Sequence, residues 1–243
     1  MARPNALKWY DGPSEIDGSP IIGVVSGLIR PSSNRKTGDL FQTWILPRDV
    51  KPNDAVKTGE DRSVCGDCEM RPILHREKAV EDRPCYVKTF QGPRSVWEGV
   101  KGQPVATVDQ LVNTPNRFTG LRFGAWGDPT AIPLHEWRVL LRIMCGSIDT
   151  RRSPGYTHQW RTCDRRWSQL LMASVHTEAE RQEARALGYR TFRIVSGVAE
   201  VVRGEVVCPN VTHGVQCLKC ALCNGSTGVD WDGRKDIAIA IHR

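Results

Sequence analysis

Two groups of cysteines constrain this chain more than any other feature. The first is Cys65-Gly-Asp-Cys68, and sixteen residues separate Cys68 from Cys85. The second holds four thiols within sixteen residues: Cys208, Cys217, Cys220 and Cys223. Thiolates are soft ligands, and such groups select zinc, copper(I) or iron–sulfur clusters. We therefore expect the chain between the two groups to act as a scaffold that brings a metal centre to a substrate.

The composition is typical of a globular protein. Of the 243 residues, 40% are hydrophobic and 25% are charged, and a chain of this length buries a sizeable core. No run approaches the roughly 18 apolar residues of a membrane span, and the N-terminus lacks the apolar stretch of a secretory signal. We expect a cytoplasmic protein with no membrane partner. In that compartment nine cysteines bind metal or react more often than they form disulfides.

The chain is expected to form one domain, residues 1–243, which consists of four regions. Residues 1–60 contain two apolar runs, 20–29 and 40–46, joined by turn-forming residues, and this pattern predicts a β-hairpin. Residues 61–92 form the first cysteine loop, whose polar part lacks periodicity and is expected to be held by metal. An extended segment at 85–90 and a short helix at 93–100 follow. Residues 120–200 form a β/α core, and residues 205–243 form the C-terminal cysteine region.

Strands and helices alternate in the core. Strands are expected at 120–125, 154–160, 171–175 and 189–195, and helices at 134–145, 164–170 and 178–187. Thr177 with Glu180 forms a capping box, Asp164 is an N-cap, and Gly146 and Gly188 are helix stops. This alternation implies a parallel sheet with right-handed crossovers. The predicted class is α/β, as a partial (β/α) barrel or an open parallel sheet, with an N-terminal hairpin and cysteine-rich loops.

In either architecture the functional edge is the carboxyl end of the parallel strands. Asp128, His158 and His176 lie at these strand ends, and we take them as candidate catalytic residues. Ser174 is a candidate contact to a cofactor. The alternatives are a turn-forming aspartate before Pro129 and structural histidines.

A basic surface raises the question of a nucleic-acid partner. The formal net charge is +7, and arginines interleave with Tyr156, Trp160 and Trp167. These arginines are Arg151, Arg152, Arg161, Arg165 and Arg166. Arginines beside aromatic rings can hold phosphates and stack on bases. The alternative is a solvated helix face with core aromatics. The absence of a glycine-rich phosphate loop weighs against an NTPase.

Each cysteine group leaves more than one metal open. Four thiols suit a [4Fe–4S] cluster or tetrahedral zinc in the second group. The repeated two-residue gap with a remote fourth cysteine favours the cluster. In the first group, three thiolates on a cluster would leave one iron without a protein ligand. With His75 the same cysteines would make a Cys₃His zinc site. Cys145 and Cys163 are expected to stay unliganded.

The chain carries an ordered series of motifs: Cys65-x-x-Cys68 with Cys85-Tyr-Val, then Gly-Ala-Trp-Gly-Asp-Pro, Gly-Tyr-Thr-His, Met-Ala-Ser-Val-His and the C-terminal cysteines. This series resembles that of small radical-SAM-like iron–sulfur proteins encoded by bacteriophages. The resemblance implies a SAM-binding cluster on Cys65, Cys68 and Cys85, and an auxiliary cluster on the second group. It also implies that Gly127 and Asp128 lie near the amino group of S-adenosylmethionine. The host cytoplasm is the implied location.

Two functions follow as hypotheses from different classes. The first is a radical-SAM-like iron–sulfur protein acting on nucleotides or nucleic acid, with an external electron donor. The alternative is a non-enzymatic, zinc-stabilised nucleic-acid-binding protein. A structural or host-modulating protein that uses its centres only as staples is a third.

Overall fold

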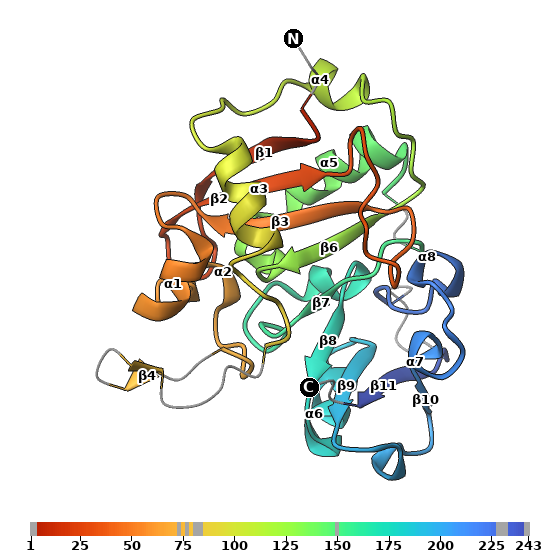
Figure 1. The fold of residues 1–243 in the computed structure, drawn as a ribbon. Coiled ribbons are helices and arrows are strands. Elements are labelled where there is room, and N and C mark those ends of the chain that lie inside the picture. Colours follow the sequence, from red (N-terminus) through yellow and green to blue (C-terminus); the bar gives the residue numbers. More distant parts are fainter. Residues whose placement is uncertain are drawn as a thin grey trace.

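The computed structural model describes residues 4–71, 74–75, 78–79, 85–148, 151–226 and 233–240, and shows a mixed α/β fold (Figure 1). Its N-terminal sheet has the strand order β1–β2–β3–β6. The strands are β1 (Ala6–Pro13), β2 (Pro20–Ser26), β3 (Phe41–Pro47) and β6 (Leu121–Trp126). The first three are antiparallel, whereas β6 runs parallel to β3. The predicted hairpin is therefore β2–β3.

The C-terminal sheet contains five parallel strands in the order β10–β11–β9–β8–β7. They are β7 (Tyr156–Thr157), β8 (Met172–Val175), β9 (Thr191–Val195), β10 (Glu205–Val207) and β11 (Asp236–Ala240). The backbone N–H of Phe123 in β6 donates to the carbonyl of Pro154 at 2.9 Å, so the two sheets adjoin. Neither sheet closes on itself within the described residues, in agreement with the predicted open α/β sheet.

The α-helices of the described residues are α1 (Pro52–Thr58), α2 (Arg62–Cys65), α3 (Gly92–Val100), α4 (Val108–Val112), α5 (Leu134–Cys145), α6 (Glu178–Ala186), α7 (Pro209–His213) and α8 (Cys217–Cys220). Two of them, α3 and α5, cover opposite faces of the N-terminal sheet (Figure 1). In Figure 1, α3 crosses in front of this sheet and α5 lies behind it. Trp97 of α3 donates its indole N–H to the carbonyl of Pro47 at 2.9 Å. Trp137 of α5 packs with its ring centroid 4.9 Å from those of Trp9 and Phe123. These buried aromatics join both faces to one hydrophobic core.

Short elements complete the chain. The 3₁₀ helices are η1 (Pro129–Ala131), η2 (Arg165–Gln169) and η3 (Val198–Glu200), and β4 (Leu74–His75) pairs with β5 (Lys78–Ala79). Asp164 caps η2, and Thr177 with Glu180 forms the predicted capping box of α6. Helix α5 has the predicted bounds and ends at Gly146, whose φ is +69°.

Four expectations need correction. Strand β6, expected in the parallel sheet of the core, pairs instead with β3 in the N-terminal sheet, which β1 extends by pairing antiparallel with β2. Residues 85–90 contain no strand, and the strand expected at 154–160 covers only Tyr156–Thr157. The C-terminal cysteine region also supplies two strands, β10 and β11, that were not predicted. Their pairing joins segments distant in sequence, which local periodicity does not reveal.

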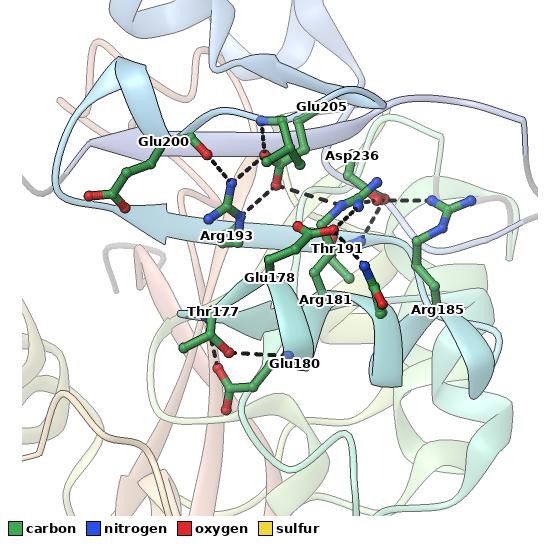
Figure 2. Close-up of polar contacts among 12 residues, drawn as sticks. Thr177, Glu178, Glu180, Arg181, Arg185, Thr191, Arg193, Glu200, Glu205 and Asp236 are labelled. Atoms are coloured by element: carbon green, nitrogen blue, oxygen red, sulfur yellow. Dashed lines mark hydrogen bonds and ion pairs between the residues drawn. The ribbon is translucent and has the colours of Figure 1, made fainter.

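A buried ionic network holds the outer part of the C-terminal sheet (Figure 2). Arg193 of β9 pairs with Glu205 of β10 at 2.6 Å. Arg181 and Arg185 of α6 pair with Asp236 of β11 at 3.0 and 2.9 Å. Asp236 also accepts the backbone N–H of Thr191 at 2.9 Å. The network fixes α6, β9, β10 and β11 together, and therefore also the cysteine region between β10 and β11.

Candidate metal centres and strand-end site

The first cysteine group comes together although the sequence separates its members. Cys65 ends α2 and is buried, and Cys68 lies in the following turn. The N–H of Cys85 donates to the carbonyl of Met70 at 3.2 Å, which returns Cys85 to this turn. Burial raises the pKa of Cys65, and nearby Asp61, Cys68 and Cys85 raise it further. Burial and Cys85 likewise raise the pKa of Cys68 to about 12. A bound cation would relieve this mutual repulsion of the ionised thiols.

Side chains from outside the group clamp the cysteine turn. Arg71 donates to the carbonyls of Gly66 and Gly59 at 2.8 and 3.0 Å, and pairs with buried Asp61 at 2.8 Å. The Gln159 amide donates to the carbonyl of Cys65 at 3.4 Å. No local pattern marks Arg71, because an arginine in a polar loop is ordinary. Gln159 was visible only as one of several polar residues after a strand.

Asp128 joins β6 to β7 beside this turn. Its backbone N–H donates to the carbonyl of Val64 at 2.5 Å. One carboxylate oxygen accepts the N–H and the hydroxyl of Thr130 at 3.0 and 2.8 Å. The other accepts the hydroxyl of Thr157 at 3.1 Å and the N–H of His158 at 2.8 Å. Burial raises the pKa of Asp128, while these hydrogen bonds oppose that rise. The geometry assigns Asp128 a positioning role, since its oxygens are already engaged by neighbours.

The two candidate histidines meet at the same edge. Their ring centroids lie 6.0 Å apart. Burial and then His176 lower the pKa of His158 to about 4, so it is neutral near pH 7. The N–H of His176 donates to the Glu180 carboxylate at 2.8 Å. Its Nε2 lies 3.6 Å from the carboxylate of Glu69, which belongs to the cysteine turn. Strand ends and cysteine turn therefore form one site.

Gly127 and Ser174 occupy packed positions at this edge. Gly127 has a φ of +86°, and a Cβ there would come within 2.5 Å of the carbonyl oxygen of Ile45. Glycine is therefore required by backbone packing. Ser174 is buried within β8, and its carbonyl accepts the indole N–H of Trp160 at 3.2 Å.

The second cysteine group surrounds one cavity. Cys208 caps α7, Cys217 and Cys220 begin and end α8, and Cys223 follows. All four line the same cavity with Asn210, Val215 and Leu222. Burial raises the pKa of Cys217, Cys220 and Cys223, and neighbouring thiols of the group raise it further. The hydroxyl of Tyr156 hydrogen-bonds to Cys223 and lowers its pKa in opposition. Four thiols line this apolar cavity, but within the described residues no three of them are arranged around one metal position.

Backbone contacts fix the loops that carry these thiols. The fully buried guanidinium of Arg190 donates to the carbonyls of Leu222 and Asn224 at 2.7 and 2.9 Å, on either side of Cys223. The N–H groups of Cys217 and Leu218 donate to the carbonyls of Lys36 and Thr37 at 2.9 and 3.1 Å. Sequence reasoning missed Arg190, because nothing local distinguishes a buried arginine from a solvated one.

Other candidate ligands stand apart. The side chain of His75 lies outside the described residues. Cys145 is half-buried on α5, where burial raises its pKa to about 12. The sulfur of Cys163 lies 3.2 Å from the hydroxyl of Tyr189. Over the part of the chain that the structure describes, no three His, Cys, Asp or Glu side chains are placed to hold a metal ion.

The five candidate arginines do not form one surface of unopposed charge. Arg161 lies over the ring of Trp160, at 3.9 Å, and pairs with Glu180 and Glu183 at 3.3 and 2.8 Å. Arg166 pairs with Asp164 at 2.5 Å. Arg151, Arg152 and Arg165 are exposed.

Comparisons with known proteins assign no family to this chain. No family model, curated protein or solved structure matches this chain. None of the helices in the described residues is long and apolar enough to cross a membrane.

Proposed function

We propose that this chain is an iron–sulfur protein with two cysteine-held centres. The observation that carries the proposal is that four cysteines line one cavity. Cys65, Cys68 and Cys85 lie near one another at the turn beside Asp128. Buried thiols without a bound cation are costly to ionise, whereas thiolates that bind metal repay that cost. The spacing of the second group, with two gaps of two residues, favours a cluster over a single zinc ion.

The two centres have different tasks in this proposal. Four thiolates close the second centre, which is typical of a structural or electron-transfer role. Three thiolates would leave an open iron position in the first centre, at the functional edge of the sheet. When bound, such a cluster would supply one electron and a site for a small molecule. The resemblance to radical-SAM-like proteins proposes S-adenosylmethionine as that molecule, with a nucleotide or nucleic acid as substrate.

The residues around the first centre position it and transfer protons. Arg71 and Gln159 hold the cysteine turn, and Asp128 orients the backbone of His158. Neutral His158 can accept a proton from a group bound at this edge. His176, next to Glu69, can receive or return that proton.

Three cysteine variants test the proposal. Cys65→Ser removes one thiolate ligand of the first centre, and Cys217→Ser removes one of the second. Cys145→Ser is the control away from both centres. After reconstitution without oxygen, S-adenosylmethionine should alter the electron paramagnetic resonance signal of reduced wild-type and Cys217→Ser protein. It should not alter that of Cys65→Ser. A signal that S-adenosylmethionine leaves unchanged in the iron-loaded wild-type protein would contradict the proposed open centre.

A further inference from the structure

Two exposed aromatic rings stand out on the segment that leaves the first cysteine group. Tyr86 is 72% exposed and Phe90 is 61% exposed, and they are the only aromatics among the large exposed apolar side chains of the described residues. Lys88 lies between them in the sequence and is also exposed. Monomeric proteins rarely leave grouped apolar side chains in water without a binding role.

A cation connects this segment to the second cysteine group. Arg122 of β6 donates to the hydroxyl of Tyr86 at 3.0 Å. The same guanidinium lies near Cys217. The backbone N–H of Cys217 in turn donates a hydrogen bond to the carbonyl of Lys36. Around these contacts the exposed charged residues are Lys88, Arg35, Lys36 and Lys219, with Asp39 as the one carboxylate in residues 31–39, 85–90 and 217–220.

We propose that Tyr86, Phe90, Lys88 and Arg122 form a binding strip for single-stranded nucleic acid. Aromatic rings stack on unpaired bases, and the cations between them neutralise phosphates. Lysine is depleted in the core of protein–protein interfaces, so its place between two rings favours nucleic acid over a protein partner. The strip begins at the residue after Cys85. Resting on the proposed function at this one point, it would deliver a nucleotide to the first centre.

Binding to a fluorescent oligothymidylate of about twelve nucleotides, a length within the usual site size, tests the strip by anisotropy. Tyr86→Ala and Phe90→Ala should each weaken binding by about fivefold or more, because each removes a stacked base. Tyr86→Phe keeps the ring and should retain most of the affinity.

Lys57→Gln is the matched control for Lys88→Gln, because each removes one exposed lysine. Only Lys88→Gln should reduce the slope of affinity against salt, by about 0.7 for one lost phosphate contact on a single strand. Equal effects of the two charge variants, with unchanged binding by Tyr86→Ala and Phe90→Ala, would overturn the strip. So would the absence of oligonucleotide binding by metal-loaded wild-type protein.

Metal content measured on the same samples separates the two proposals. A protein that binds the oligonucleotide through Tyr86 and Phe90 but holds no iron upholds the strip and contradicts only the iron–sulfur proposal. An iron-loaded protein whose binding ignores both rings contradicts only the strip.

Discussion

The carboxylate of Asp128 joins the end of β6 to β7 at the candidate site. Asp128→Asn replaces one acceptor oxygen by an NH₂ group. The single oxygen that remains cannot accept from both Thr130 and the Thr157–His158 pair. Leaving buried donors unsatisfied costs about 1–3 kcal/mol. We expect urea denaturation to show that loss in the free energy of unfolding. Exposed Asp39→Asn should change it by no more than about 0.5 kcal/mol, and equal losses would contradict the role of Asp128.

His158 makes stability fall on the acid side. Its pKa is about 4 in the folded protein and close to 6.5 in an unfolded chain. The unfolded chain therefore takes up a proton first as the pH falls, and the free energy of unfolding decreases between pH 6.5 and 4. His158→Gln should remove up to about 3 kcal/mol of this decrease. Denaturation series at several pH values measure it, with exposed His135→Gln as control. Identical pH dependence in wild type and His158→Gln would contradict the burial of a neutral imidazole.

Among the elements, β11 depends most on charge. Asp236 is 0% exposed and pairs with two arginines of α6. Removing one partner of a buried pair costs about 3–5 kcal/mol, because the remaining charge is left uncompensated. Asp236→Asn should therefore strongly lower the urea midpoint. Glu98→Gln, which breaks the exposed pair with Arg94, should cost about 0.5 kcal/mol or less. Similar midpoints for the two variants would show that the network in Figure 2 contributes little.

Helix α8 and the loop before β3 should respond together to metal removal. A helix of four residues is not stable alone, and two of its N–H groups bond to the carbonyls of Lys36 and Thr37. Chelation of the second centre should therefore free this loop, and trypsin should cut faster after Arg35 and Lys36. Mass spectrometry of timed digests follows the cuts, with Lys57 of α1 as the reference site. Equal cleavage with and without metal would mean that the loop does not depend on the centre.

Local patterns predicted the elements whose cause is local. The apolar spacing of α5, its glycine stop and the capping box of α6 are all legible in consecutive residues. The strand β1 was missed because its buried residues are consecutive and do not alternate, and the pairing of β10 with β11 was missed because the two strands lie far apart in the chain. Asp128, His158 and His176 were predicted at one edge because parallel strands end there together. The clamps made by Arg71 and Arg190 depend on distant carbonyls, which no local motif marks.

At the scale of the whole molecule, we propose two cysteine centres on one open α/β scaffold. The first lies at the strand ends with Asp128 and His158, and the second lies between α7 and α8 beside the loop before β3. The buried network of α6, β9, β10 and β11 fixes the two strands that flank the second cysteine group. The identity of the metal is the claim on which the proposed chemistry depends.

Iron, acid-labile sulfide and zinc content per chain, measured after purification without oxygen, test that claim most directly. Each cubane cluster holds about four irons and four sulfides, so two clusters predict about eight of each per chain. They also predict a visible absorption band near 400 nm. Stoichiometric zinc without iron, reproduced when the cells are supplied with iron and grown anaerobically, would contradict the account and leave a zinc-stabilised binding protein.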